Sequence, residues 1–467
     1  MTTKQQQQQR ETAVIRAPHD GSEVGVVALA GPEEVRAALD ANVAASRACR
    51  EMPAYARAAA LRKVADGLES ARAELARTLA LEAGKPIAQA RIEIDRSIFV
   101  FRDAAEEATR IGGDVLPADA VPAGAGRIAI TRRFPLSPIS AITPFNFPIL
   151  LAAHKIAPAM ACGATITLKP PPQDPLTTLR LGELVNASGY PAGGVNIVPC
   201  HVEVAQILID DPRVRLITFT GSAKAGWGIR AKAGSKRVVL ELGGNASVII
   251  EPDADLTWAA TRCAVGGFTY AGQSCISTQR IFVHERVYQA FLDIVLPKVR
   301  QLKTGDVLDD QTDVGPMIAL EAAERVERWI AEAVAGGAKI AVGGKRHGIF
   351  LEPTVLLHTS QEMKVNCEEV FAPLVTITPY RTVAEAVAWA NASPYGLQAG
   401  VFTTNLQTMF RLHAELDVGG VNGNDIPGFR VDRLPYGGSK ASGLGREGVH
   451  YAIEEMTELR VLTLKIE

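Results

Sequence analysis

The chain has 467 residues, of which 47% are hydrophobic and 21% charged, and its formal net charge is -2. This length exceeds what one hydrophobic core normally supports, so two or three domains are expected. A nearly balanced charge offers no electrostatic basis for binding nucleic acid or an acidic membrane surface. None of the 6 cysteines forms a close pair typical of a metal knuckle or redox motif. The chain is therefore expected to be a globular cytoplasmic protein with reduced cysteines.

The N-terminus carries a polar run, Gln5 to Gln9, and lacks the apolar segment of a signal peptide. It is interpreted as a frayed tail. The longest apolar runs are interrupted by Pro, Gly, Lys or His, so no membrane span is expected. Residues 33–46, 54–81 and 87–109 then carry apolar residues at helical spacing, which predicts three amphipathic helices.

Short apolar runs alternate with helical stretches in the next part of the chain, after an alternating strand-like segment at 126–134. Strand, helix and strand in this rhythm predict a parallel sheet covered by helices, in which ligands bind at the carboxyl ends of the strands. The expected strands are 139–142, 164–168, 194–198, 216–219 and 238–240, and the helices include 175–186 and 204–210.

Polar residues follow three of these expected strands. The first is followed by Thr143 and the sequence Pro-Phe-Asn-Phe-Pro, and the second by Lys169. The fourth is followed by Gly221 and Ser222, which open a helix and could present free backbone N–H groups to a phosphate. Taken singly, these residues also fit a surface lysine and an ordinary helix cap.

Residues 443–448 read Gly-Leu-Gly-Arg-Glu-Gly and match the dinucleotide-binding fingerprint. The preceding Pro-Tyr-Gly-Gly is turn-like, and too few residues follow for the rest of a strand-helix-strand unit. The segment is interpreted as a glycine-rich loop that closes over a site or an interface.

A second strand-helix region is expected from residue 241 onward. Its expected strands are 247–250, 280–283, 374–379 and 400–403, with helices at 287–302 and 320–335. The end of the chain, 459–466, alternates so that Leu462, Leu464 and Ile466 share one face, as in an edge strand that pairs with another element or subunit.

Cys275 lies in Gly-Gln-Ser-Cys-Ile-Ser, among small and polar residues. A reactive cysteine needs partial access to solvent and nearby donors or positive charge, and this context permits access. The alternative is a small buried hydrophobic residue, which is the common state of a cysteine.

Four motifs in this order resemble the aldehyde dehydrogenase superfamily, in its lactaldehyde and semialdehyde type. They are Pro-Phe-Asn-Phe-Pro around Asn146, Leu-Glu-Leu-Gly-Gly-Asn around Glu241, Gly-Gln-Ser-Cys at Cys275, and Glu-Glu-Val-Phe-Ala-Pro around Glu369. The resemblance covers nearly the whole chain. It implies an α/β protein with two Rossmann-like parallel-sheet domains and a small β oligomerisation arm. The implied boundaries are 1–120 with 140–242 for the cofactor-binding domain, 243–446 for the catalytic domain, and 121–139 with 447–467 for the arm.

The resemblance also implies the roles of three residues. Cys275 would attack an aldehyde carbon, the Asn146 amide and the Cys275 backbone N–H would bind the oxyanion, and Glu241 would be the general base. Taken alone, Glu241 would be read as a salt-bridged glutamate at a strand end. The expected partner is a small aldehyde, and the expected assembly is a homodimer or homotetramer. The expected cofactor is NAD.

The cofactor contacts follow from the same resemblance. Ser222 is placed at the pyrophosphate, Lys169 at the adenosine ribose, and Glu369 at the nicotinamide ribose. The remaining implied cofactor residues are Gly221, Phe371, Thr143 and Phe145. The chain departs from a common pattern at Pro172, where many NAD-preferring members have a ribose-binding glutamate. Losing that carboxylate removes a repulsion against a 2′-phosphate, so NADP is allowed as well.

Two sequence features bear on the substrate. Members that oxidise phosphorylated aldehydes often have a basic residue before the nucleophile, whereas this chain has Ser274, with Phe147 after the asparagine. This favours a small neutral, hydroxylated or moderately apolar aldehyde. Arg96 and Arg102 fall on a helix that lines the substrate entrance in relatives, so a carboxylated semialdehyde stays open. Both arginines also fit a helix surface paired with acidic residues.

Two other functions would also fit parts of this pattern. The first is a CoA-acylating semialdehyde dehydrogenase, in which CoA replaces water. The second is a catalytically silent structural protein on the same fold. Retention of Glu241 argues against the first, and the complete set of Asn146, Glu241 and Cys275 argues against the second.

Overall fold

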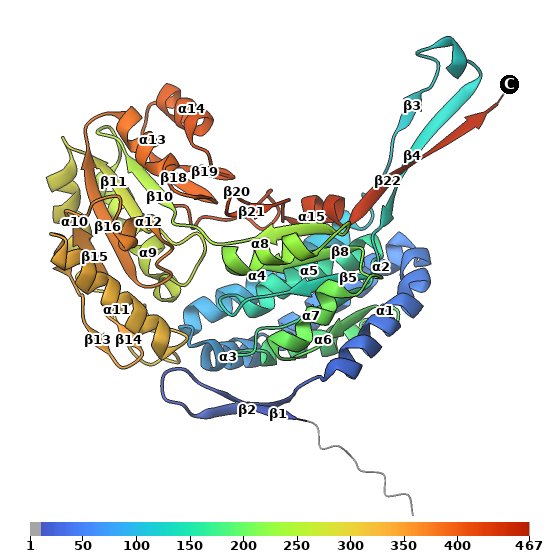
Figure 1. Ribbon diagram of the computed structural model, residues 1–467, viewed down its shortest axis with the longest axis horizontal. Coiled ribbons are helices and arrows are strands. Elements are labelled where there is room, and N and C mark those ends of the chain that lie inside the picture. Colours follow the sequence, from blue (N-terminus) through green and yellow to red (C-terminus); the bar gives the residue numbers. More distant parts are fainter. Residues whose placement is uncertain (1–10, 467) are drawn as a thin grey trace, which may run out of the picture.

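The computed structural model describes residues 11–466, so the predicted tail at Gln5 to Gln9 lies outside the described residues. The chain forms two lobes, each built on a sheet, and an arm that projects from one of them (Figure 1). Between residues 11 and 466, no helix has the length and apolar character needed to cross a membrane.

The first lobe contains a six-stranded sheet in the order β21-β9-β8-β5-β6-β7. All neighbouring strands are parallel except β21, which runs antiparallel to β9. The strands are β5 Ile139–Ile142, β6 Ile166–Lys169, β7 Val195–Ile197, β8 Leu216–Thr220, β9 Arg237–Glu241 and β21 Gly443–Leu444. The predicted parallel sheet is therefore present, with the predicted strands near their expected positions.

Helices surround this sheet (Figure 1). They are α1 Pro32–Glu51, α2 Ala54–Ser70, α3 Arg72–Ala83, α4 Ile87–Glu107, α5 Pro148–Cys162, α6 Leu176–Asn186, α7 Val202–Asp210, α8 Ala223–Lys232 and α15 Val449–Glu455. Every residue of α5 is buried, which explains its apolar sequence on all sides. The single helix predicted at 54–81 is instead two, because Ala71 leaves helical geometry between them. Periodicity could not reveal this break, since alanine itself favours helix.

The second lobe contains a seven-stranded sheet in the order β12-β15-β16-β11-β10-β18-β19, parallel except for β12. Its strands are β10 Ser247–Ile250, β11 Arg280–His284, β12 Lys339–Val342, β15 Thr354–Leu357, β16 Leu374–Tyr380, β18 Gln398–Phe402 and β19 Gly420–Gly423. Its helical elements are α9 Leu256–Phe268, η2 Thr269–Gly272, α10 Tyr288–Arg300, α11 Leu320–Ala335, α12 Lys364–Cys367, α13 Val383–Asn391 and α14 Leu406–Glu415. Short strand pairs complete it: β13 Arg346–His347 with β14 Phe350–Leu351, and β17 Tyr395–Gly396 with β20 Ser439–Lys440. The two predicted parallel sheets are thus both confirmed.

The projecting arm consists of β3 Val115–Pro117, β4 Arg127–Pro135 and the final strand β22 Thr457–Lys465, with η1 Pro122–Gly124 in its loop. β22 pairs antiparallel with β4 along its whole length. The predicted terminal strand is therefore present, and Leu462, Leu464 and Ile466 are all exposed.

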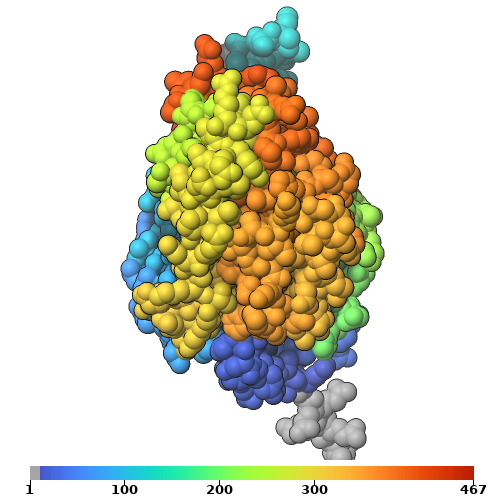
Figure 2. Space-filling model, turned by 90° about the vertical axis from the view of Figure 1, so that its left-hand side faces the viewer, coloured from blue at the N-terminus to red at the C-terminus, as the bar shows by residue number. Residues whose placement is uncertain are grey.

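Sequence reasoning missed several strands, among them β12, β15 and β19 of the second sheet and the two strands of an N-terminal hairpin. Strands β1 Thr12–Arg16 and β2 Glu23–Ala28 form an antiparallel hairpin. In Figure 2 this dark blue segment lies at the foot of the molecule, below the yellow and orange surface of the second lobe. Both strands of the hairpin are short, so the alternation of polar and apolar residues along them was too weak to predict a strand.

The expected domain boundaries stay a prediction, but three segments make contacts outside the domain that the resemblance implied for them, through two strand pairings and one helix contact. β21 belongs to the edge of the first sheet, although 443–444 was expected in the catalytic domain. α15 packs against α5, although 449–455 was expected in the arm. β3 pairs with β4, although 115–117 was expected in the cofactor-binding domain. Each of these contacts joins segments that are separated in the sequence, so it becomes visible only in the folded chain.

Candidate active site

A cavity of about 920 Å³ is lined by residues from both lobes. Eight of the ten site residues predicted from sequence line it: Phe145, Asn146, Gly221, Ser222, Glu241, Cys275, Glu369 and Phe371. Thr143 and Lys169 lie outside its lining, at the ends of β5 and β6. The strands and helices that carry these residues are far apart in sequence, so the fold brings the separate motifs to one cavity.

A tight backbone segment precedes Cys275. Tyr270, Ala271 and Gly272 all have positive φ angles, of 50°, 52° and 67°. A Cβ atom on Gly272 would lie 2.1 Å from the main-chain oxygen of Ala372, so only glycine fits there. The Tyr270 hydroxyl donates a 2.7 Å hydrogen bond to the Ala83 carbonyl. These contacts hold an unfavourable backbone conformation directly before the cysteine, as is common at functional sites.

Cys275 differs in its surroundings from the other cysteines. Four cysteines are buried, while Cys275 and Cys367 are partly exposed, and of these two only Cys275 lines the cavity. Its Sγ atom lies 3.0 Å from the hydroxyl oxygen of Tyr436. Burial raises the pKa of the thiol to about 12. The resting group is therefore a thiol that must lose its proton before it can act as a nucleophile.

Asn146 is held by its backbone while its side chain faces the cavity. Its main-chain carbonyl accepts a 2.7 Å hydrogen bond from Lys85, which forms a buried ion pair with Glu93. The Lys85 ammonium also lies 4.0 Å from the ring centroid of Phe147. Within residues 11–466, the side-chain Oδ1 of Asn146 has no hydrogen-bond partner.

Glu241 ends β9 and is 3% exposed. Neither of its carboxylate oxygens has a hydrogen-bond partner in the described part of the chain. Burial, followed by repulsion from Glu447, raises the pKa of Glu241 well above its ordinary value. A raised pKa makes the ionised form of Glu241 a stronger base than an exposed carboxylate, as suits a general base.

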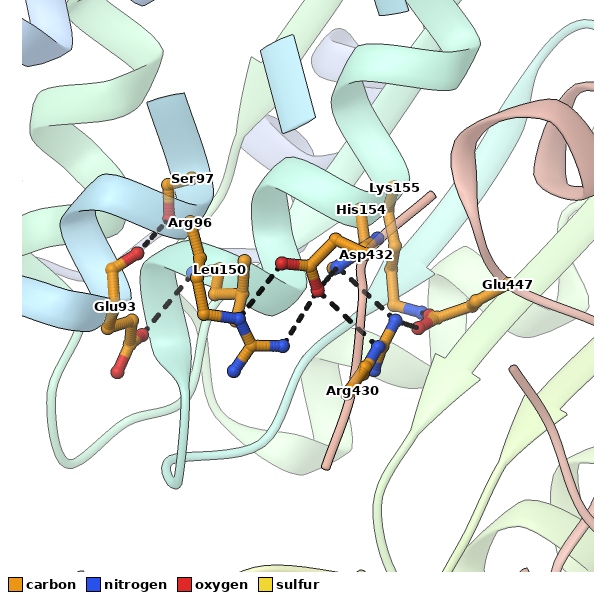
Figure 3. A network of polar contacts seen from close by, with 9 residues as sticks. All are labelled: Glu93, Arg96, Ser97, Leu150, His154, Lys155, Arg430, Asp432 and Glu447. Atoms are coloured by element: carbon orange, nitrogen blue, oxygen red, sulfur yellow. Dashed lines mark hydrogen bonds and ion pairs between the residues drawn. The ribbon is translucent and has the colours of Figure 1, made fainter. Parts of the chain in front are cut away.

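A buried polar network adjoins Glu241 and was missed by sequence reasoning (Figure 3). Lys155 donates to Glu447 at 3.0 Å, and Arg430 contacts both Glu447 and Asp432. Asp432 also pairs with Arg96 and lies 3.0 Å from His154 Nε2. The members come from α4, α5 and two separate loops near the C-terminus, so no local motif could have indicated the cluster.

Glu369 and Phe371 occupy another part of the cavity wall. The amide of Gly244 donates a 2.8 Å hydrogen bond to Glu369, and burial raises the pKa of this carboxyl to about 7. Phe371 has a positive φ of 52°, and its ring packs edge-to-face on Phe145 with centroids 5.9 Å apart. The fold therefore joins residues of two distant motifs in direct contact.

The N-terminus of α8 also opens on the cavity. Ser222 caps the helix and accepts a 3.4 Å hydrogen bond from the Ala225 amide, whereas the buried hydroxyl of Thr220 has no partner among the described residues. A Cβ atom on Gly221 would lie 2.5 Å from the Phe219 ring, so the chain passes close to that ring. Lys169 is buried and donates to the Pro170 carbonyl at 3.1 Å. Burial lowers the pKa of Lys169.

The two arginines predicted at a substrate entrance are separated by the fold. Arg96 lines the cavity and is 28% exposed, with Asp432 as its ion-pair partner. Arg102 lies outside the lining and pairs with Glu69 on the surface, so the interpretation as a paired surface residue applies to it. Arg262 of α9, which was not singled out, lines the cavity and pairs with Asp425.

Comparison with known proteins identifies the family. Residues 4–462 match the model of the Aldehyde dehydrogenase family. A 3-sulfolactaldehyde dehydrogenase of Priestia aryabhattai is 45% identical over 413 residues, which cover 88% of this chain and 87% of the relative. The crystal structure of aldehyde dehydrogenase 21 from Physcomitrella patens, in complex with the reaction product succinate, matches with a TM-score of 0.96 and 42% identity, covering 98% of this chain and 96% of that one.

A further solved structure carries a bound dinucleotide. It is the glyceraldehyde-3-phosphate dehydrogenase GapN from Methanocaldococcus jannaschii complexed with NADP, with a TM-score of 0.94 and 37% identity, covering 98% of this chain and 100% of that one. These matches confirm the predicted resemblance and the two-domain Rossmann-like α/β fold. The chain therefore belongs to the aldehyde dehydrogenase family of oxidoreductases.

Proposed function

We propose that this chain oxidises an aldehyde to a carboxylic acid with NAD(P) and that Cys275 is the nucleophile. One observation carries the proposal: Cys275, Asn146 and Glu241 line the same cavity. Within the described residues, the Asn146 Oδ1 and both Glu241 oxygens have no hydrogen-bond partner, although burying such atoms unpaired is costly. Groups kept in this state are typical of sites where a substrate or water completes the hydrogen bonding.

The first step is attack by the Cys275 thiolate on the aldehyde carbon. The carbonyl oxygen becomes an oxyanion, which the Asn146 amide and the Cys275 backbone N–H stabilise by donating hydrogen bonds. The thiol proton is released to water in the cavity, which leaves the Glu241 carboxylate free to act as the base in the later hydrolysis step.

The tetrahedral adduct then loses hydride from its former aldehyde carbon, and the Cys275 thioester remains. When bound, NAD(P) supplies the hydride acceptor for this step. Glu241 then removes a proton from water, which attacks the thioester carbon. Cleavage of the carbon–sulfur bond releases the carboxylic acid and regenerates the sulfur of Cys275 as a thiolate.

The residues in the cavity fit a dinucleotide. The N-terminus of α8 at Ser222 presents backbone N–H groups and a favourable dipole to a pyrophosphate. Beside it lies the Thr220 hydroxyl, which has no hydrogen-bond partner among residues 11–466. Glu369 would accept from the nicotinamide ribose, and Phe371 would pack on the nicotinamide side. Lys169 and Thr143, which lie outside the cavity lining, would act at the adenosine end at the tips of β6 and β5.

The choice between NAD and NADP depends on Pro172. Its ring replaces a carboxylate that would repel a 2′-phosphate, so we propose use of both cofactors with NAD somewhat favoured. Initial rates with each cofactor test this proposal. A strong preference for NADP would contradict it.

The proposed substrate is a short aldehyde, hydroxylated or neutral, because Ser274 rather than a basic residue precedes the nucleophile. A specific observation favours a second class, a short aldehyde with a sulfonate or carboxylate. Arg96 and Arg262 line the cavity, and each stays partly exposed although paired. The relative named for 3-sulfolactaldehyde and the solved structure in complex with the reaction product succinate are consistent with such a class. Assays with lactaldehyde, 3-sulfolactaldehyde and succinate semialdehyde separate the two.

The Cys275→Ala variant tests the nucleophile. We expect loss of aldehyde oxidation with NAD(P) binding nearly unchanged, because the sulfur contributes only to the covalent step. Cys367→Ala is a matched control, since Cys367 is also partly exposed but lies outside the cavity lining. Retained turnover in Cys275→Ala would remove Cys275 from the mechanism.

The Glu241→Gln variant separates hydrolysis from the CoA-acylating alternative. We expect a rapid burst of NAD(P)H followed by slow turnover, because the thioester still forms but water is no longer activated. Stimulation of the wild-type steady rate by CoA, with an acyl-CoA product, would favour the alternative instead. A steady rate unchanged in Glu241→Gln would exclude this residue as the base for hydrolysis.

We also propose that the arm mediates assembly into a homodimer or homotetramer. Leu462 and Leu464 of β22 and the adjoining Ile466 expose apolar side chains on one face of the arm, and Leu459 and Val461 do so on the other, which is costly for an isolated molecule. Leu462→Glu with Leu464→Glu should lower the mass measured by light scattering. Thr463→Glu, on the opposite face of the same strand, should leave it unchanged.

A further inference from the structure

Tyr436 lies between the Cys275 sulfur and the Arg430 guanidinium. Its hydroxyl oxygen is 3.0 Å from Sγ of Cys275, and the guanidinium carbon of Arg430 is 3.8 Å from the ring centroid. Tyr436 is 4% exposed, and the Arg430 side chain is 8% exposed. Both contacts are made away from bulk water, where electrostatic interactions are strong.

The backbone fixes the direction of this ring. The Tyr436 amide donates to the Glu447 carbonyl at 3.0 Å, and the Glu447 amide donates to the Tyr436 carbonyl at 2.6 Å. The ring also packs in an apolar cluster with Ile276 and Leu397, and Cys275 lies against that cluster. The hydroxyl is therefore held toward the sulfur before any substrate arrives.

Glu93, which Figure 3 also draws, is paired with Lys85, and the rest of the buried network behind Tyr436 carries an excess of positive charge. Burial and Arg430 lower the pKa of His154, so this ring is neutral near pH 7. The remaining charged members are three cations and two carboxylates: Arg96, Lys155 and Arg430 with Asp432 and Glu447. One additional negative charge nearby would balance the network.

Two groups next to this network can supply that charge, the Cys275 thiol and the Glu241 carboxyl. Within residues 11–466, the Glu241 oxygens accept no hydrogen bond. The Cys275 sulfur, in contrast, is in contact with the Tyr436 hydroxyl. A thiolate can only accept a hydrogen bond, so in that state the Tyr436 O–H must be the donor. Burial raises the pKa of Tyr436 well above its ordinary value, which keeps the donated proton on the phenol.

We propose that Tyr436 and Arg430 activate the nucleophile: the Tyr436 hydroxyl donates a hydrogen bond to the thiolate of Cys275, and Arg430 stacks on the ring to strengthen that bond. A cation over an aromatic face draws electron density from the ring and makes the hydroxyl a stronger donor. Tyr436 contacts the reacting sulfur directly, and Arg430 is a positioning residue that acts through it. The inference rests on the proposed role of Cys275.

The other charged groups that face the sulfur act against ionisation. Burial raises the pKa of Cys275 most, and Glu369 and Glu241 raise it further. The Tyr436 hydrogen bond and Arg430 lower it. Their removal should therefore make the thiolate harder to form.

Alkylation of Cys275 by iodoacetamide tests the proposal without cofactor or aldehyde. The modified peptide is measured by mass spectrometry across a range of pH. In Tyr436→Phe, the ring and its stacking are kept and only the hydroxyl is lost. We expect the alkylation profile to move upward by about one pH unit or more, since hydrogen bonds to charged groups are strong. At pH 7.5 less of the thiol is ionised, which slows alkylation. A thiolate of higher pKa is also more nucleophilic, which offsets part of this loss, so the rate should fall at least about threefold.

Two further variants complete the test. Tyr288→Phe, whose hydroxyl points to the Ile377 carbonyl on the second lobe, should keep the wild-type profile. Arg430→Lys keeps the charge beside Asp432 and Glu447 but loses the planar stacking, so an intermediate shift is expected. An unchanged profile in Tyr436→Phe overturns the proposal, and an unchanged profile in Arg430→Lys overturns the part assigned to stacking.

Failure of this inference can be told apart from failure of the proposed function. If Cys275→Ala is inactive but Tyr436→Phe alkylates as the wild type does, Cys275 remains the nucleophile and Tyr436 has no part in its activation. If Cys275→Ala still oxidises aldehyde, the proposed function itself is wrong, whatever the alkylation profile.

Discussion

The Lys85 ammonium donates a 2.7 Å hydrogen bond to the main-chain carbonyl of Asn146. Lys85 is 1% exposed and forms a buried ion pair with Glu93, whose carboxylate also accepts from the Leu150 amide at 3.3 Å. One ion pair therefore ties α4 to both the residue proposed as oxyanion donor and the first turn of α5. Because the backbone of Asn146 is fixed in this way, its amide can be oriented before the substrate binds.

Variants of this ion pair should distinguish its effect on folding stability from its effect on the catalytic rate. Lys85→Met leaves Glu93 buried without a partner, which should destabilise the fold by about 3–5 kcal/mol. The double variant Lys85→Met with Glu93→Gln removes the stranded charge and should recover most of the melting temperature. Its kcat should stay about tenfold low, since Asn146 has lost its anchor. Calorimetry and steady-state assays measure the two effects, and a double variant that recovers both would show that the ion pair has no role in positioning.

Stability should depend on pH through Glu241. Its pKa is raised in the folded state, so the folded protein holds this proton more tightly than the unfolded chain does. The stabilisation is fully present below the ordinary glutamate pKa and is lost as pH rises through the raised value. Glu241→Gln cannot ionise, so it should melt at a higher temperature than the wild type at pH 8. The two should melt together at pH 4. An equal difference at both pH values would contradict the ionisation argument.

Gly243 leaves space for Glu369. A Cβ atom at Gly243 would lie 2.3 Å from Glu369 Oε2, so Gly243→Ala should displace the carboxylate proposed to bind the nicotinamide ribose. We expect the Kd for NAD(P) to rise about tenfold, because the displaced carboxylate loses roughly one hydrogen bond to the cofactor. Gly228→Ala is a matched control, since no atom lies within 4 Å of its Cβ position. Titration calorimetry measures both, and equal affinities would indicate that Glu369 does not bind the cofactor.

Arg96 and Arg102 offer a paired test of substrate charge on one helix. Arg96 lines the cavity and Arg102 does not. If the substrate is anionic, Arg96→Gln should lower kcat/KM for 3-sulfolactaldehyde about tenfold more than for lactaldehyde. Arg102→Gln should change neither. Equal losses for both aldehydes in Arg96→Gln would favour the neutral substrate class.

Local sequence carried much of the fold. The buried strands and the amphipathic helices have distinct periodicities, so both parallel sheets could be predicted from them. The hairpin of β1 and β2 could not be predicted, because its alternation is short and gives no distinct pattern. The break at Ala71 could not be predicted either, because alanine favours helix. The sequence also did not predict which strands pair with each other, as the pairing of β21 with β9 shows.

For the site, the sequence by itself determined which chemical groups the chain carries, because Cys275, Asn146, Glu241 and Glu369 each lie in a recognisable motif. Only the tertiary structure decided their environment. It placed Tyr436 and Arg430 behind the sulfur, left Glu241 without a hydrogen-bond partner among the described residues, and separated Arg96 from Arg102. Reactivity depends on burial and on charges from distant segments, and these arise only when the chain has folded.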